Sequence, residues 1–252
     1  MVSRIQQLGT RILPRGWGDW LRQIVLFCGA YYVYRIVRGM VDDRVATAFA
    51  NAREIVSIER GLHLFVEPDI QRFARAHEWL IDVSSWMYVN SHFVVTTVAL
   101  AWIYLRRNER FYFVRNMFMV AMGLALVLYV LFPTAPPRLL PDLGFVDLAN
   151  RYGESIYGPY ADGLSGQLMA MPSLHVGWAA LVAWTVWRQA VGRGRWLGIG
   201  HLVVMTVVVV ASANHWWMDG LVAVALLVLV VAAVERMPRI VRLAAPLEPA
   251  SA

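Results

Sequence analysis

The chain has 252 residues, of which 59% are hydrophobic and only 16% are charged. Soluble domains average about 45–50% and about 25%, so the composition argues against a single water-soluble domain. All 23 basic residues are arginine, and with 17 acidic residues they leave a net charge of +6. Because these arginines are spread over the segments between apolar runs, they indicate cytoplasmic membrane flanks. A nucleic-acid-binding stripe is not expected.

Apolar runs of about twenty residues predict an all-α, polytopic bundle of six transmembrane helices, because about twenty helical residues cross a bilayer. The predicted spans are 20–40, 80–105, 111–132, 172–191, 196–214 and 216–235. We therefore expect a cytoplasmic N-terminal segment over 1–19, a six-helix membrane domain over 20–235 and a cytoplasmic tail over 236–252.

Clusters of arginine set the expected orientation of this bundle. Six spans place four clusters on one side of the membrane: Arg4, Arg11 and Arg15; Arg106, Arg107 and Arg110; Arg193 and Arg195; Arg236, Arg239 and Arg242. The positive-inside rule makes that side cytoplasmic. Five arginines between Arg44 and Arg75 lie on the opposite side, interleaved with acidic residues. The protein is expected in the plasma membrane.

Two segments between the spans are expected on the extracytoplasmic side. Residues 44–78 are too charged to cross the membrane, but apolar residues recur there at helical spacing. This pattern predicts an interfacial helix between the first and second spans. Residues 133–171 contain five prolines and several glycines, which predict an irregular loop.

Four ionisable residues away from the cytoplasmic flanks could carry chemistry: Arg138, His175, His215 and Asp219. His215 and Asp219 are four residues apart, so they share one helix face. The carboxylate can then accept a hydrogen bond from one imidazole nitrogen and leave the other nitrogen to attack. This arrangement is typical of a nucleophilic histidine. A buried His–Asp pair that only joins helices is the alternative.

The spacing of the other two residues brings them to the same membrane boundary. His175 lies 40 residues before His215, which corresponds to about two membrane crossings. Arg138 lies in the loop that enters the fourth span from that side. Ser173 begins the same span, where helix N–H groups favour an anion such as phosphate. A serine that only caps the helix is the alternative.

These motifs resemble the type 2 phosphatidic acid phosphatase superfamily, and within it the branch similar to inositol phosphorylceramide synthases. MPSLH, which ends at His175, is similar to the second motif of the superfamily, and HWWMD, from His215, is similar to the third. FPTAPPR with the following LLPDLGFVD resembles a loop of the synthase-like branch. ERGLHLFVEPDIQ and the region of His92 add to this resemblance, which covers about residues 54–235.

The resemblance implies a six-helix catalytic domain with its active site at the membrane surface. It implies that His215 is the nucleophile and forms a phosphohistidine, that Asp219 orients it, and that His175 is the acid for the leaving group. Phosphohistidine chemistry needs no metal ion or cofactor, and the single cysteine, Cys28, excludes a cysteine-based metal site. The implied substrate-binding residues are Arg138 and Ser173, and Arg151 and His92 are further candidates.

Two departures from the phosphatase pattern bear on the substrate. The sequence contains no lysine, whereas the phosphatases carry one in their first motif, and Val208 and Val209 stand where the phosphatases place Ser-Arg. Arg138 alone matches a doubly charged monoester poorly, and a diester carries one charge less. We therefore expect a lipid phosphotransferase that is inositol phosphotransferase-like and uses a lipid or polyol acceptor. A lipid phosphatase that releases inorganic phosphate is the alternative.

Two other classes of protein are less consistent with these motifs. A non-catalytic transporter would account for the helices but would need no convergence of Arg138, His175, His215 and Asp219. An intramembrane serine protease would use the sequence GLSG at 163–166, with Ser165 as nucleophile and His215 as base. Ser165 precedes the fourth span by several residues, and a Ser–His pair leaves Asp219 unexplained.

Overall fold

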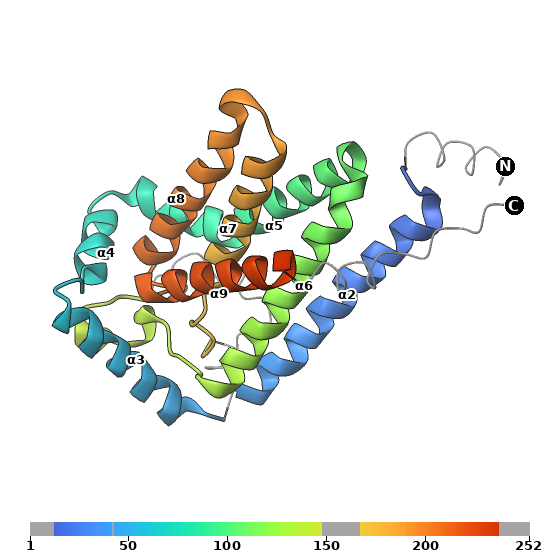
Figure 1. The fold of residues 1–252 in the computed structure, drawn as a ribbon. Coiled ribbons are helices and arrows are strands. Elements are labelled where there is room, and N and C mark those ends of the chain that lie inside the picture. The colour runs from blue at the N-terminus through green and yellow to red at the C-terminus, as the bar shows by residue number, and fades with distance from the viewer. Residues whose placement is uncertain (1–12, 42, 148–166, 237–252) are drawn as a thin grey trace, which may run out of the picture.

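The computed structural model describes residues 13–41, 43–147 and 167–236, and this part of the chain is helical (Figure 1). The all-α fold class is therefore confirmed, and the chain is a polytopic membrane protein. Five helices of the described chain are long and apolar enough to cross a membrane. They are α2 (Gly16–Val41), α5 (Glu78–Arg106), α6 (Asn108–Leu131), the segment Gly192–Ala211, which includes α8 (Arg195–Ala211), and α9 (Trp217–Arg236).

The fourth predicted span forms a shorter helix, α7 (Leu174–Gln189). Its 16 residues extend over about 24 Å, whereas the hydrocarbon core of a bilayer is about 30 Å thick. The 3₁₀ turn η5 (Gly192–Gly194) then leads directly into α8. Six helices thus occupy the predicted positions, and the prediction that all six cross the membrane stays untested.

The predicted interfacial helix over residues 44–78 is wrong in one respect, because this segment forms two helices. These are α3 (Val45–Gly61) and α4 (Glu67–Arg75). His63, just after α3, has a left-handed φ of 58°, which an α-helix cannot continue. Pro68 lies in the first turn of α4, where the fixed φ of proline favours helix initiation.

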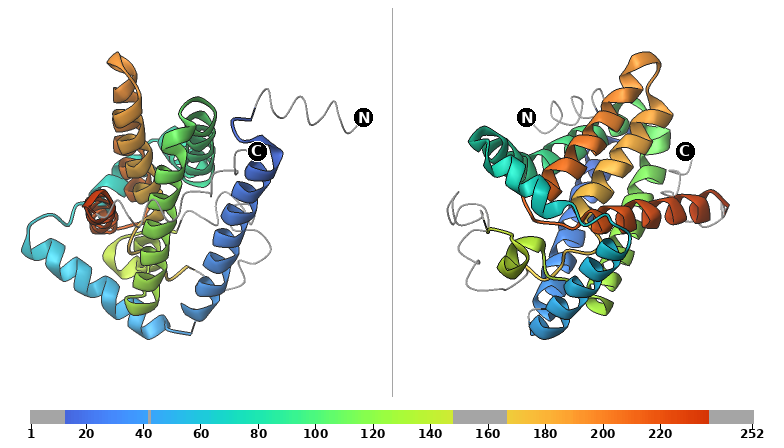
Figure 2. Two further views of the ribbon diagram at one scale, coloured as in Figure 1. Left: turned by 45° about the vertical axis from the view of Figure 1, so that its right-hand side comes forward. Right: turned by 90° about the vertical axis from the view of Figure 1, so that its left-hand side faces the viewer.

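Small residues allow α7 to pack closely against its two neighbours. Helices α7 and α8 form a hairpin whose arms lie side by side (Figures 1 and 2). A Cβ atom on Gly198 of α8 would lie only 2.8 Å from the Cα atom of Ala183 on α7. On the other side, a Cβ atom on Gly177 of α7 would contact Ala223 of α9 at 3.6 Å. Glycine at these helix contacts lets the backbones approach.

A buried polar network attaches α2 to the rest of the bundle. Asp19 accepts hydrogen bonds from the hydroxyl groups of Tyr104, at 2.9 Å, and Tyr112, at 2.7 Å. Gln23 donates to Asp19 and accepts a hydrogen bond of 2.8 Å from Arg115. Helix α2 accordingly runs beside α6 (Figure 2). Polar groups inside a membrane bundle need such partners.

The loop after α6 is irregular in its described part, as predicted. It contains two 3₁₀ turns, η1 (Pro137–Leu139) and η2 (Pro141–Leu143). Its two ends meet where the amide of Thr134 donates to the Leu168 carbonyl oxygen at 2.9 Å. Trp216, which is fully buried, donates from its ring to the Ala135 carbonyl oxygen at 3.0 Å. This loop is therefore held against the start of α9.

Candidate active site

His215 and Asp219 form a hydrogen-bonded pair at the start of α9. The Nδ1 atom of His215 lies 3.2 Å from Asp219 Oδ2 and 2.9 Å from the Ala170 carbonyl oxygen. Both oxygens accept hydrogen bonds, so Nδ1 carries the proton. The other nitrogen, Nε2, forms no hydrogen bond with the described residues. This tautomer leaves the lone pair of Nε2 available for attack on a ligand.

The backbone before α9 fixes the position of the His215 ring. Helix α8 ends at Ala211, and Ala213 adopts a left-handed φ of 53°. The amide of His215 then donates to the Val209 carbonyl oxygen at 3.1 Å. Asp219 Oδ2 also accepts the Trp216 amide at 2.9 Å, so the orienting carboxylate caps its own helix. Asp219 is completely buried, which excludes competing water.

His175 lies beside this pair, in the first turn of α7. The centroids of the His175 and His215 rings are 5.6 Å apart. The Nε2 atom of His175 donates to the Tyr88 carbonyl oxygen at 3.1 Å, and the Tyr88 ring stacks on the imidazole at 4.1 Å. Because Nε2 is used in this hydrogen bond, Nδ1 is the nitrogen that can exchange a proton with a ligand.

Arg138, on η1, is 5% exposed and is held from two sides. Its Nη2 atom donates to Gln167 Oε1 at 2.7 Å, and its Nε atom lies 3.7 Å from Asp147 Oδ1. Its backbone amide donates to the Ala213 carbonyl oxygen at 2.9 Å. These contacts fix the guanidinium group next to the turn that carries His215.

One cavity, of about 160 Å³, brings the predicted residues together, and we call it the catalytic pocket. Three of its lining residues, Arg138, His175 and His215, were predicted to act on phosphate. His92 also lines it, and its Nδ1 atom donates to the Tyr88 carbonyl oxygen at 3.0 Å. Asp219 lies behind His215, outside the lining. The pocket thus joins a cation, a candidate acid and a candidate nucleophile.

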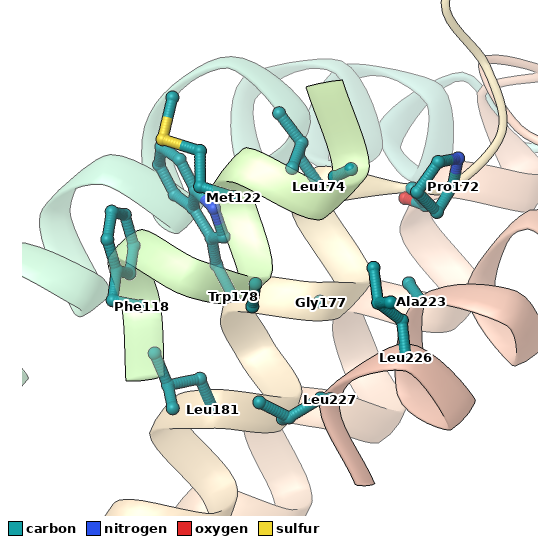
Figure 3. A pocket seen from close by; sticks show the side chains of 13 residues that line it. Phe118, Met122, Pro172, Leu174, Gly177, Trp178, Leu181, Ala223, Leu226 and Leu227 are labelled. Carbon is teal, nitrogen blue, oxygen red and sulfur yellow. The ribbon is translucent and has the colours of Figure 1, made fainter. Parts of the chain in front are cut away.

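Ser173 lies elsewhere, as the capping alternative predicts. Its Oγ atom accepts the Val176 amide at 3.3 Å, so it caps α7. It does not line the catalytic pocket but an adjoining apolar cavity of about 30 Å³ between α6, α7 and α9, which shares Met122, Leu174 and Trp178 with that pocket. Figure 3 shows apolar side chains around this cavity, including Met122 and Trp178. A role of Ser173 in phosphate binding stays a prediction.

Two other predicted positions, Arg151 and the GLSG sequence with Ser165, lie outside the described residues. Their roles in substrate binding and in a protease mechanism therefore stay predictions.

The structure adds residues of α2 that the sequence interpretation missed. Tyr31, Tyr34 and Arg38 line the catalytic pocket, and Arg38 is its second cation among the described lining residues. These three residues recur at helical spacing, which places them on one face of α2. This spacing is the feature of the sequence that could have grouped the three residues. Nothing in the sequence, however, indicated that this face meets the motifs after residue 130.

Comparison with known proteins gives the family of the chain. The sequence matches the family model of the PAP2 superfamily over residues 53–233, which is well over half of the chain. The chain belongs to the PAP2 superfamily. The resemblance to type 2 phosphatidic acid phosphatases is therefore confirmed at the level of the superfamily, and the match identifies no branch within it. No curated protein and no solved structure matches the chain.

Membership of the PAP2 superfamily supports an enzyme of the lipid phosphatase or phosphotransferase type. It favours this class over a transporter and over a serine protease. The matched residues include His175, His215 and Asp219 but not α2. Arg38 therefore comes from a helix outside the PAP2 match.

Proposed function

We propose that the protein is a lipid phosphotransferase that moves a headgroup phosphate through a phosphohistidine at His215. The proposal depends on one observation above all. His215 donates from Nδ1 to Asp219 and to the Ala170 carbonyl oxygen, and it lines a pocket with Arg138 and His175. The four arginine clusters support a site on the extracytoplasmic face of the plasma membrane.

In the first step, His215 Nε2 attacks the phosphorus atom of a phosphodiester lipid. An N–P bond forms as the P–O bond to the lipid alcohol breaks, and His175, which enters this step as an imidazolium with a proton on each nitrogen, gives its Nδ1 proton to the leaving oxygen. Arg138 and Arg38 neutralise charge on the phosphoryl oxygens. The Asp219 carboxylate stabilises the positive charge that develops on the His215 ring.

In the second step, the hydroxyl group of a lipid or polyol acceptor attacks the same phosphorus atom. An O–P bond forms, the N–P bond to His215 breaks, and His175 takes the proton of the hydroxyl group. The residues named thus end each cycle in the protonation state in which they began it. Water is a slower acceptor in the same position.

An apolar cavity supports a lipid donor. This cavity, of about 660 Å³, lies between α2, α5 and α6 and shares Tyr31, Phe93, Met122 and Trp178 with the catalytic pocket. A hydrocarbon chain that extends from a phosphate near His215 would continue into it and remain in apolar surroundings. We call it the chain cavity.

The residues at the phosphatase Ser-Arg position support a diester donor. Val208 and Val209 are buried in an apolar cluster with Val176 and Met205, and neither lines the catalytic pocket. They therefore offer a phosphate neither charge nor a hydrogen bond. A singly charged diester needs less compensation than a doubly charged monoester, which favours the synthase-like branch and transfer between alcohols.

A lipid phosphatase is the second candidate, and one observation favours it. Arg38 gives the pocket a second cation beside Arg138, although the superfamily's lysine and arginine are missing. Two arginines suit the charge of a phosphate monoester better than one.

Purified protein in detergent, given labelled monoester and diester lipids side by side, separates the two candidates. We expect faster transfer from the diester to an added alcohol than release of inorganic phosphate from the monoester. His215→Ala serves as the inactive blank. Faster release of inorganic phosphate from the monoester would overturn the transferase proposal and leave the site unchanged.

Arg38 can be tested in the same assay. Arg38→Gln should reduce turnover of the monoester about tenfold, and that of the diester less, because a charge-assisted hydrogen bond is worth about 1.5–3 kcal/mol. Arg35→Gln is the matched control, since Arg35 is on the same helix but outside the pocket lining. Equal effects of the two substitutions would remove Arg38 from the site.

A further inference from the structure

Two buried carboxyl groups lie beside the start of α9, close to His215, and the proposed mechanism does not use them. Glu59 is on α3 and Glu67 begins α4, and both are completely buried. Glutamate is seldom fully buried unless it is paired, because an isolated charge is costly away from water. The surroundings of these two carboxyl groups therefore need an explanation.

Both carboxyl groups face the N-terminus of α9. Glu67 Oε1 accepts the backbone amide of Trp217 at 3.2 Å, and the amide of Met218 acts on Glu59. The first amides of a helix have no partner within the helix, and Glu67 supplies one for Trp217. Asp219 accepts the Trp216 amide. The start of α9 is thus surrounded by three carboxyl groups.

The two glutamates are also neighbours, since burial and then the Glu67 charge raise the pKa of Glu59. Ionised carboxylates only accept, and both oxygens of Glu59 and Oε2 of Glu67 have no conventional hydrogen bond to the described residues. One proton between the two groups turns this repulsive contact into a hydrogen bond. Carboxyl pairs that share a site behave in this way, because two adjacent negative charges cannot both persist.

The surrounding charges decide which glutamate carries the proton. The charged groups that act on Glu59 are Glu67 on α4 and Asp219 on α9. Burial, and then the Glu67 and Asp219 charges, raises the pKa of Glu59 to about 9. Burial also raises the pKa of Glu67, but the Trp217 amide stabilises its ionised form. Glu59 is therefore the neutral partner at pH 7.

We propose that Glu59 and Glu67 share one proton and act as positioning residues, which fix the first turn of α9 and with it the orientation of the His215–Asp219 pair. The contacts run from Glu67 to the Trp217 amide, along two residues of α9 to Asp219, and from Asp219 to His215 Nδ1. The consequence for turnover rests on the proposed function, whereas the consequence for α9 does not.

Substitutions at Glu59 test the shared proton. Glu59→Gln keeps the shape and a donor toward Glu67, so it should retain kcat at pH 7 within about twofold. Glu59→Leu removes the donor and should lower kcat by about 10²-fold with little change in KM, as expected for a misplaced nucleophile. Glu54→Gln, an exposed glutamate of the same helix, is the control and should behave as wild type.

The pH profile separates positioning from simple support of the fold. In the wild type, loss of the shared proton near pH 9 creates two adjacent charges, so kcat should fall through a one-proton step. The step should be absent in Glu59→Gln, which has no proton to lose, and present in Glu54→Gln. An alkaline step that is identical in wild type and Glu59→Gln would overturn the proposal.

Amide hydrogen exchange tests, without any substrate, whether Glu59 and Glu67 fix the first turn of α9. The Trp216 and Trp217 amides should be protected in wild type and in Glu59→Gln at pH 7, and should exchange faster in Glu59→Leu. Equal protection in all three proteins would refute the positioning role. Faster exchange in Glu59→Leu, together with no phosphoryl transfer from any lipid by the wild type, would refute the proposed function but still support the positioning role of the carboxyl pair.

Discussion

Arg138 donates its backbone amide to the carbonyl oxygen of Ala213, 2.9 Å away and two residues before His215. The candidate phosphate-binding residue and the candidate nucleophile are 77 residues apart in the sequence, yet a main-chain hydrogen bond joins their turns. This backbone hydrogen bond therefore holds the segment that carries the guanidinium group next to the segment that carries the imidazole. Such preorganised charge is what a phosphoryl transition state requires.

The first prediction concerns the covalent intermediate. His215→Ala should abolish turnover, and Asp219→Asn and His175→Ala should each lower kcat by about 10²–10⁴-fold, the range typical of a positioned acid–base group. An acid-labile phosphoryl group should be detectable on the protein after reaction with phosphorus-labelled lipid. The exposed His77 provides the control, since His77→Ala should carry the label normally. Label on His215→Ala would exclude a phosphohistidine at this position.

Local spacing explains which parts of the site were predictable. The four-residue interval between His215 and Asp219 predicts the pair, which is present with Nδ1 facing the carboxylate, but His215 lies in the bend before α9 and not on the helix face expected for it. The helices were predictable for a similar reason, since bilayer thickness sets the length of apolar runs. The exception is the charged segment 44–78, where a turn at His63 divides one expected helix into two.

Long-range packing explains what the sequence could not show. Arg38 reaches the catalytic pocket only because α2 packs along α6, and nothing within α2 indicates that partner. The sequence alone predicts Glu59 and Glu67 to be exposed charges of an interfacial helix, whereas the tertiary structure buries both of them. Ser173 was expected in the site from its place in the sequence, but its side chain accepts the Val176 amide and does not line the catalytic pocket.

The second prediction concerns the contact between α7 and α8. Gly198→Ala should destabilise the protein by about 1–3 kcal/mol, the usual cost of overpacking, because the added Cβ atom would lie 2.8 Å from the Ala183 backbone. Gly200→Ala on the same helix meets nothing within 4 Å and should be neutral or slightly stabilising. Thermal unfolding in detergent measures both variants. Equal unfolding temperatures would mean that the two helices pack less closely than described.

The third prediction concerns orientation in the membrane. In a Cys28→Ala background, Asp142→Cys on the exposed surface of η2 should react with an impermeant maleimide in intact cells. Arg107→Cys, at the opposite end of α5 and α6, should react only after the membrane is permeabilised. The reason is that the arginine clusters hold their side in the cytoplasm. The reverse pattern of labelling would place the catalytic pocket on the cytoplasmic face.

The last prediction concerns the chain cavity, through the neighbouring residues Thr97 and Val98 of α5. Both residues are exposed, but only Thr97 lines the cavity. Thr97→Trp adds about 100 Å³ of side chain inside the cavity, on the order of three to four buried methylene groups. It should therefore raise KM for long-chain lipids more than for short-chain lipids with the same headgroup. Val98→Trp should leave this ratio unchanged.

The measurement is kcat/KM for a series of lipids that differ only in chain length. Each excluded methylene group removes about 0.8 kcal/mol of binding, so preference should shift by about fourfold per carbon over the affected length. Because the headgroup is constant, the chemistry at His215 contributes equally to every member of the series. A uniform loss at all chain lengths would show that the substitution disturbs the catalytic pocket, and no change at all would show that the hydrocarbon chain lies elsewhere.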